Sequence, residues 1–346
     1  MNRQASCPCK WLLRAPTLAI LAPLCLMLAT HAEAQQVIKY GVAGNSISHA
    51  PPFLSEVAPE IFAKYNLKLE ITDFRGKSAN CVTALISGSV DVCQVGATTG
   101  TDAIVEGANF KAVAVTTGPI NEVILSSRTV AKLGVKADAP VDERLRALKG
   151  LRIVTAAPGS AHYTTLGSML KRVGLGMSDL KFRTLGEPVA MMESIRHDQI
   201  DGAFWTIGSL SGLLVDGAGV RWISVPRGDV PELKSIPFVA VFAQTAWVEK
   251  NPDVVVRLNA ALADAIAHLK TEPAKYSKLL KAKYFPDLSQ AIWEDGFQQA
   301  VPSFFDGAKA PRGGWEQLLR MQSEGTGKTY ALAAFDKVLL PMAQGK

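Results

Sequence analysis

Hydrophobic and polar residues alternate along several short stretches of this chain, the pattern typical of half-buried strands. Between Leu67 and Phe74, the apolar Leu67, Leu69 and Ile71 alternate with charged or hydroxyl-bearing neighbours. Similar stretches predict strands over residues 37–42, 90–95, 110–117, 123–126 and 236–244.

Other stretches place apolar residues three or four positions apart, as an amphipathic helix does. They predict helices over residues 51–64 and 101–107, and a helix capped by Ser78. Asn251-Pro252-Asp253 combines a capping residue, a proline at the first helical position and an acidic first turn, which predicts another helix start. Strands that alternate with helices indicate a largely parallel sheet with α/β layering.

One stretch occurs twice, 110 residues apart. Residues 75–93 read RGKSANCVTALISGSVDVC and residues 185–203 read LGEPVAMMESIRHDQIDGA, so that Gly76 aligns with Gly186 and Asp91 with Asp201. Upstream, VIKYGVAGNS (37–46) aligns with LRIVTAAPGS (151–160). The repeat predicts two similar three-layer α/β lobes with a ligand cleft between them.

The first 34 residues have the features of a cleavable signal peptide. Three positive residues precede an apolar run over 15–29, and Ala32-Glu33-Ala34 offers a cleavage site. The run is short and contains two prolines, which argues against a membrane span. We therefore expect an exported protein that begins near Gln35.

The remaining 312 residues are enough for two domains with separate cores. We expect one lobe to consist of residues 35–122 and 238–346, and the other of residues 123–237. The chain would then cross between the lobes twice, near 119–126 and 226–238, which is a two-stranded hinge. Closure about such a hinge is a common response to a ligand.

Charge and cysteine content narrow the possible partners. Without the leader, which holds three positive side chains and one negative, the formal charge falls from +6 to +4. The charges are interspersed, so we expect no nucleic-acid partner. Cys81 and Cys93 are the cysteines that remain, and they form either a disulfide in an oxidising compartment or two free thiols buried against the sheet.

Motifs of common enzymes are absent downstream of the leader. The sequence has no H-E-x-x-H, no G-x-S-x-G and no paired-cysteine zinc pattern. Gly325–Thr329 is similar to the end of a phosphate loop, but Gln322 stands where the first glycine of that loop belongs. We expect no catalytic residues, no cofactor and no metal.

Small and polar residues gather where predicted strands end and predicted helices begin. Backbone N–H groups at such helix starts are unpaired and favour anions. The candidate ligand-binding residues of the first half are Asn45, Ser46, His49, Lys77, Ser78, Gly96, Ala97, Thr98 and Thr117. Those of the second half are Gly159, Ser160, His162, Glu187 and Trp205.

Each of these candidates also has an ordinary structural interpretation. Ser46 and His49 could cap a local helix, Lys77 could be a solvated surface residue, and Gly96 could belong to a plain turn. His162 is expected to be a neutral donor, because a helix start disfavours its protonated form. Glu187 is either a ligand-facing acid, which would favour an amino or hydroxyl group on the ligand, or an ordinary first-turn carboxylate.

The order of these pieces resembles the periplasmic substrate-binding proteins of ABC transporters with the type II fold. The residues that carry the likeness are Gly76-Lys77-Ser78, Ala84–Asp91, Leu148–Ile153 leading to Pro158-Gly159-Ser160, Glu187-Pro188, Gln199–Asp201 and Asn251-Pro252. Within that group the chain looks most like the binders of sulfonates, taurine, nitrate and thiamine-pyrimidine precursors. The likeness covers nearly all of residues 37–300 and weakens after them.

This resemblance implies a periplasmic, monomeric protein that delivers a small anion to an ABC transporter permease in the inner membrane. A ligand-sensing partner of a membrane receptor is an alternative with the same fold. The resemblance also extends to a pyrimidine synthase of fungal type, but that enzyme calls for a cluster of cysteines, and Cys81 and Cys93 alone depart from it.

Overall fold

Two five-stranded sheets form the centre of the protein in a computed structural model, which describes residues 34–158 and 160–345. The first sheet has the order β2-β1-β3-β10-β4 and the second has the order β7-β6-β8-β5-β9. The strands of the first sheet are β1 (Gln36–Val42), β2 (Leu67–Asp73), β3 (Val92–Gly96), β4 (Phe110–Thr117) and β10 (Val239–Gln244). Those of the second are β5 (Asn121–Ser126), β6 (Ile153–Thr155), β7 (Arg183–Thr184), β8 (Gly202–Thr206) and β9 (Gly219–Ser224). The predicted signal peptide falls almost wholly outside the described residues.

Each sheet contains one strand that runs against its neighbours. β1 is parallel to β2 and β3, whereas β10 is antiparallel to β3 and β4. In the second sheet β6 is parallel to β7 and β8, whereas β5 is antiparallel to β8 and β9. The chain leaves the first sheet after Thr117 and returns to it at Val239. This topology confirms the predicted two-lobe α/β fold and its two connections.

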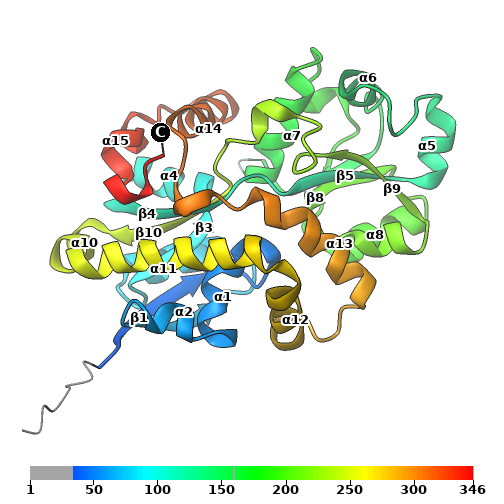
Figure 1. Cartoon of the computed structure of the whole chain (residues 1–346). Coiled ribbons are helices and arrows are strands. Elements are labelled where there is room, and N and C mark those ends of the chain that lie inside the picture. Colours follow the sequence, from blue (N-terminus) through cyan, green and yellow to red (C-terminus); the bar gives the residue numbers. More distant parts are fainter. Residues whose placement is uncertain (1–33, 159, 346) are drawn as a thin grey trace, which may run out of the picture. The chain divides into compact units, whose positions relative to one another are not determined.

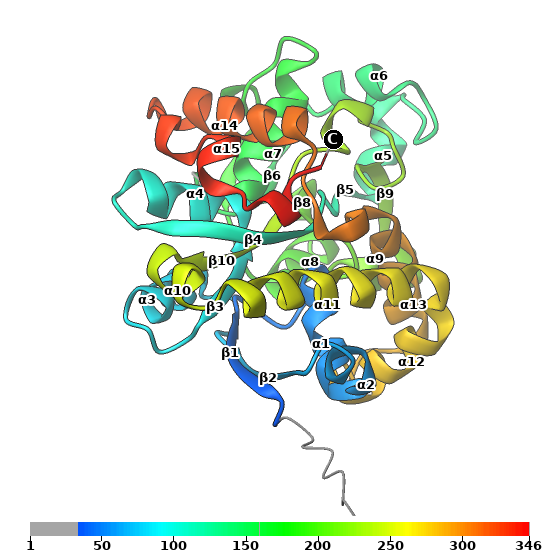
Figure 2. The same ribbon diagram turned by 60° about the vertical axis from the view of Figure 1, so that its left-hand side comes forward.

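Helices cover both faces of both sheets. On the first sheet, α1 (Ala50–Val57) and α11 (Pro252–Thr271) share one hydrophobic core, and α3 (Ser78–Ile86) and α4 (Ala97–Val105) pack on the opposite face. On the second sheet, α6 (Val141–Arg146) and α7 (Ala161–Lys171) cover one face, and α8 (Pro188–Arg196) and α9 (Ser211–Val215) cover the other. The remaining helices are α2 (Glu60–Ala63), α5 (Ser127–Leu133), α10 (Thr245–Lys250), α12 (Pro273–Tyr284), α13 (Gln290–Ala300), α14 (Arg312–Thr326) and α15 (Phe335–Val338). Figures 1 and 2 show α11 lying across the first sheet.

The C-terminal helices contact elements around both sheets. α12 packs on α1 and α11, and α15 packs on β4. α13 contacts α9 and the 3₁₀ turn Ile47–His49 (η1), and α14 contacts α7. Helices α13 and α14 therefore join the second lobe to the rest of the chain in addition to the two strand connections.

The internal repeat is visible in equivalent hydrogen bonds. The Asp91 carboxylate accepts a hydrogen bond from the Lys39 amide at 2.8 Å, and the Asp201 carboxylate accepts one from the Arg152 amide at 2.7 Å. Lys39 therefore corresponds to Arg152, one position away from the alignment that the two sequence segments predict. Strand pairing decides this register, because a slip of one residue would turn every side chain to the other face.

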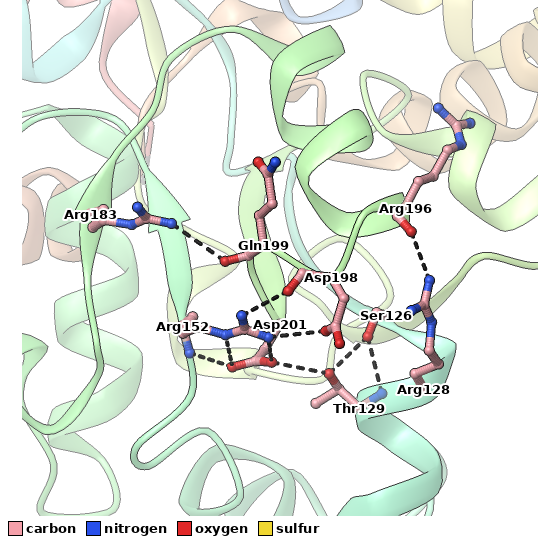
Figure 3. Close-up of polar contacts among 9 residues, drawn as sticks. All are labelled: Ser126, Arg128, Thr129, Arg152, Arg183, Arg196, Asp198, Gln199 and Asp201. Carbon is pink, nitrogen blue, oxygen red and sulfur yellow. Dashed lines mark hydrogen bonds and ion pairs between the residues drawn. The ribbon is translucent and has the colours of Figure 1, made fainter.

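Arg152 extends this contact into a polar network at the start of β6 (Figure 3). Its guanidinium donates to the carboxylates of Asp201 at 2.8 Å and Asp198 at 3.0 Å. Burial alone would raise the pKa of Asp201, but the hydrogen bonds from Arg152 hold that pKa below its usual value. Arg183 donates to the Gln199 carbonyl at 3.4 Å. This network lies at the amino end of β6, opposite to the edge where the candidate residues follow the strand.

Local details depart from the sequence predictions in four places. The helix predicted over 51–64 is broken near Pro59 into α1 and α2, and the helix predicted over 101–107 already begins at Ala97. Ser78 is the first helical residue of α3 rather than its cap, and the structure gives α3 no side-chain capping bond. Asn251 precedes α11 as predicted, but its side chain donates to the Trp247 carbonyl instead of capping the helix.

Cys81 and Cys93 form a disulfide, which decides between the two states left open by the sequence. The bond joins α3 to β3, and both residues are fully buried. Among the helices of residues 34–158 and 160–345, none is long and apolar enough to cross a membrane.

Candidate functional site

The chain crosses between the lobes after Thr117 and before Phe238, and strand ends of both sheets meet there. We call this line of contact, between Thr117 and Phe238 on one side and Ala161 and His162 on the other, the seam. Phe238, just before β10, donates its amide to the Thr117 carbonyl at 2.8 Å and accepts from the Ala97 amide at 2.9 Å. Its ring meets the His162 ring edge to face, with centroids 5.6 Å apart. Ala161 at the start of α7 packs against the core of the first lobe. Side chains of the two lobes are thus in direct contact across the seam.

His162 is the centre of the second-lobe side of the seam. Its ring stacks on Trp205, with centroids 4.3 Å apart, and its Nε2 lies 2.9 Å from the Thr206 hydroxyl. The Ser160 hydroxyl accepts a hydrogen bond from the Tyr163 amide at 3.2 Å and caps α7. Gly159, the other candidate in this loop, lies outside the described residues.

Burial lowers the pKa of His162 to about 4, so its imidazole is neutral at pH 7. The sequence also predicts a neutral side chain, but from the helix start rather than from burial. A neutral imidazole that bonds a hydroxyl can be either donor or acceptor, and this leaves it free to adapt to a bound group.

His49 occupies the first-lobe side of the seam. Its Nδ1 lies 2.9 Å from the Ser46 hydroxyl and 3.1 Å from the Ser48 hydroxyl. Thr117 donates its hydroxyl to the Ser48 carbonyl at 2.8 Å and so holds the η1 turn against β4. Burial lowers the pKa of His49 to about 4. Its Nε2 is buried and has no hydrogen-bond partner among the described residues.

Three buried polar residues at this edge were missed by the sequence analysis. Asn121 and Glu122 begin β5 and Ser224 ends β9, and all three are fully buried. Both polar side-chain atoms of Asn121, Oε1 of Glu122 and the Ser224 hydroxyl have no hydrogen-bond partner within the described part of the chain. The available sequence signal was Glu122, a charged residue near the start of a largely apolar strand. A charged residue is rarely fully buried unless it is paired.

Glu122 is paired through its other carboxylate oxygen. Arg221 on β9 donates to Glu122 Oε2 at 2.5 Å and to Asp295 on α13 at 2.6 Å. Ser211 adds a hydrogen bond to Asp295 at 2.7 Å. Burial raises the pKa of Glu122, against the lowering effect of Arg221.

The other candidates divide into buried and exposed positions. Gly96 precedes α4, and Ala97 and Thr98 are buried in the first turn of this helix. The Thr98 carbonyl accepts from Gln322 on α14 at 3.2 Å. Lys77 precedes α3 and is exposed, whereas Ser78 beside it is half-buried.

Two further candidates lie on the surface. Asn45 is exposed and donates its amide to the Tyr284 carbonyl at 3.2 Å. Glu187 is exposed at the start of α8. The structure therefore brings together Ser46, His49, Thr117, Ser160, His162 and Trp205 at the seam, and leaves Asn45, Lys77 and Glu187 at the solvent-exposed surface.

In the described ranges, no group of three or more His, Cys, Asp or Glu side chains is placed to hold a metal ion. A cavity of about 390 Å³ lies between α7 and α14, and its lining includes Tyr163, Lys171 and Met321. Of its lining residues, Tyr163 directly follows His162 in the sequence.

The sequence of this chain matches the model of one protein family. A family model described as the NMT1-like family matches residues 33–282. None of the curated protein sequences matches this chain.

Solved structures share the fold at low sequence identity. A protein of Bordetella bronchiseptica RB50 is 22% identical with a TM-score of 0.68, and the match covers 88% of this chain and 94% of that one. The periplasmic aliphatic sulphonate binding protein of Escherichia coli is 16% identical with a TM-score of 0.65, over 84% of this chain and 90% of its own. The periplasmic nitrate-binding protein of Synechocystis PCC 6803 is 16% identical with a TM-score of 0.54, over 78% and 69%. The chain has the two-lobe fold of periplasmic binding proteins, and it belongs to the NMT1-like family.

Proposed function

We propose that this protein is a periplasmic solute-binding protein that captures a small anion at the seam and delivers it to an ABC importer. The sulphonate- and nitrate-binding proteins with the same fold support this proposal. The observation that carries it is a pair of neutral histidines at the meeting of the two sheets, of which His49 is buried and His162 is half-buried.

An anion would be held by dipoles and hydrogen bonds rather than by a charged partner. α7 spans residues 161–171 and begins at the seam, and the partial positive charge of a helix start favours a negative charge there. His162 and His49 then add ring N–H or ring nitrogen groups from opposite lobes, and Trp205 supplies an apolar wall. Neutral donors in a buried site bind an anion without the cost of desolvating a second charge.

The lobes are in contact in this structure, so entry of a ligand requires them to separate. We propose that the lobe of the first sheet moves against the lobe of the second, about the connections at 118–120 and 225–238. The lobe boundary predicted at residue 122 falls inside β5, so residues 121 and 122 would move with the second lobe. The contact of His162 with Phe238 would break on opening and form again around the ligand.

The remaining parts of the proposal follow from this role. The protein would be exported by cleavage of its leader, act as a monomer, dock on a permease of the inner membrane, bind no nucleic acid and catalyse no reaction. The pyrimidine synthase alternative needs a cluster of cysteines, and Cys81 and Cys93 are joined to each other.

The proposal is tested by a thermal-shift screen of the mature chain against sulfonates, carboxylates and nitrate. A ligand at 100 times its dissociation constant is expected to stabilise the protein by about 2.7 kcal/mol. His162→Ala should weaken this binding, while His197→Ala, at an exposed position, serves as the matched control. Stabilisation by neutral or cationic compounds alone, or turnover of a bound compound, would contradict the proposal.

A further inference from the structure

The chain beyond residue 282 lies outside the part that the family model matches. Its helix α14 begins at the second crossing between the lobes. Gly314 packs so closely there that an added Cβ would lie 1.9 Å from the Ser235 carbonyl oxygen. From this point α14 runs beside α4 of the first lobe and α7 of the second (Figure 2). One helix therefore contacts both lobes and the connection between them.

Gln322 attaches α14 to the first lobe. This residue is 2% exposed, and its amide oxygen accepts a hydrogen bond from the Thr101 hydroxyl at 2.7 Å. Its amide nitrogen donates to the Thr98 carbonyl at 3.2 Å and to the Asp102 carboxylate at 3.1 Å. All three partners belong to α4, and removing the partners of a buried amide is costly. The contact between α14 and α4 is therefore a firm one.

The contact of α14 with the second lobe is weaker. Lys171, the last residue of α7, donates to the Glu324 carboxylate at 2.5 Å, but the two side chains are 59% and 57% exposed. Exposed ion pairs contribute little to stability, because water and salt screen them. Both residues also line the cavity of about 390 Å³ that separates the two helices at this place.

If the lobes separate, the contact of α14 with α7 should therefore break while its contact with α4 stays intact. We propose that α14 is a clasp, a helix that is carried by the first lobe and holds the second lobe through Lys171 and Glu324. The clasp stabilises the arrangement in which the lobes touch. A ligand enclosed between the lobes binds that arrangement, so its affinity rises with the fraction of molecules that are closed. This inference rests on the lobe movement of the proposed function and not on the chemistry of a ligand.

The distance between the lobes in the free protein tests the clasp without any ligand. Spin labels would be attached to Lys68→Cys on β2 and His197→Cys after α8, two exposed positions in different lobes. Cys81 and Cys93 are buried and joined to each other, so they do not take up the label. Double electron–electron resonance on the mature chain then measures the populations with a short and with a long interlobe distance.

Glu324→Lys should reduce the short-distance population, because two positive side chains would then face each other. Lys171→Glu combined with Glu324→Lys places opposite charges at this contact again and should restore the population. The matched control is Glu316→Lys, which makes the same change of charge on α14 at a residue that pairs with Arg312 of the same helix. This control should leave the distances unchanged.

Gly325→Leu tests the clasp in the opposite direction. Gly325 lines the cavity and an added Cβ meets nothing within 4 Å, so a leucine side chain would fill space between α7 and α14. The short-distance population should increase. Gly313→Leu is the matched control, because Gly313 is an equally unobstructed glycine near the start of α14, away from the cavity. It should not change the distances.

Ligand affinity gives a second readout. Titration calorimetry of the mature chain would use ethanesulfonate, nitrate and acetate as probes. For each probe that binds the parent, Glu324→Lys should weaken binding about two- to fivefold, the range expected for an exposed ion pair. The exchanged pair should recover the affinity of the parent.

The outcomes separate the clasp from anion capture. Equal populations in the parent and Glu324→Lys would overturn the clasp, and so would an exchanged pair that fails to restore the short distance. A free parent with the long distance alone would overturn it too. Unchanged affinity despite shifted populations would overturn its role in binding. If the populations shift as expected and none of the three anions binds, the clasp stands and the proposed function fails.

Discussion

Burial perturbs two histidines at the seam, His49 and His162. Burial lowers the pKa of each to about 4, so both are neutral in the folded protein at pH 7. In the unfolded chain each recovers a pKa near 6.5. The unfolded state therefore binds more protons between these two values, and stability depends on pH there.

His49 should make the protein less stable as the pH falls from about 6.5 to about 4. Above this window His49 is neutral in the folded and in the unfolded protein, and its full contribution to stability is present. Below the window His49 is protonated in both the folded and the unfolded protein, and no further stability is lost. The contribution of His49 is on the order of 3 kcal/mol. Urea unfolding at pH 7, 5.5 and 4 should show a smaller loss in His49→Gln than in the parent.

His197→Gln provides the control for this experiment, because the side chain of His197 is 70% exposed. It should keep the full pH dependence of the parent. If the free energy of unfolding falls equally with pH in His49→Gln and in the parent, His49 is not held neutral in the folded protein.

The disulfide acts at the scale of elements. Cys81 lies in the first turns of α3, and Cys93 lies three residues before Gly96, which precedes α4. The bond therefore ties together two helix starts that hold candidate residues. Gly41 of β1 packs against it, since a Cβ at Gly41 would lie 2.9 Å from the Cys81 sulfur.

Removing the bond should lower the free energy of unfolding by about 3 kcal/mol, the chain-entropy value for closing a loop of this length. The two cysteines are 12 residues apart. Urea unfolding of Cys81→Ala/Cys93→Ala, compared with the parent in the presence and absence of a reductant, measures this effect. The double variant should be insensitive to the reductant, and a parent that is equally insensitive would contradict the presence of the bond.

At the scale of the whole molecule, α13 connects the lobes. Gly296 on α13 packs against the backbone of Gly208, and Ile47 of the η1 turn contacts both glycines. Asp295, the preceding residue, pairs with Arg221 of the second sheet. One helix therefore contacts a loop of the first lobe and a strand of the second.

Gly296→Ala should destabilise the protein by about 1–3 kcal/mol, because the new methyl group has no room and the backbones must move apart. The added Cβ would lie 2.7 Å from the Gly208 Cα. Gly325→Ala in α14 is the matched control, since a Cβ there meets nothing within 4 Å. This control should be neutral or slightly stabilising.

Urea unfolding of both variants measures the difference. Equal stability of Gly296→Ala and the parent would show that α13 tolerates separation from Gly208.

Much of the fold is predictable from the sequence because local periodicity and the repeat determine the same elements. The alternation at Leu67–Asp73 and the start of α11 at Pro252 both appear where the pattern places them. The break near Pro59 was missed although it has a local cause, because a proline has no amide N–H and interrupts a helix. The early start of α4 at Ala97 was not predicted either. Ser160 and His162, which the sequence analysis chose from the loop after a predicted strand, lie at the seam, and their role in ligand binding stays a prediction.

Asn121, Glu122 and Ser224 were not predicted, because only the packed structure reveals which of their buried polar atoms find no hydrogen-bond partner within residues 34–158 and 160–345. The sequence by itself determined the α/β class, the two equivalent halves and the crossing of the chain between them, since these follow from periodicity and repetition. Tertiary structure alone decided the register of β6, the disulfide, the burial that makes His49 and His162 neutral, and the contact of α13 with both lobes. Each of these depends on groups far apart in the chain, whose distances no local pattern specifies.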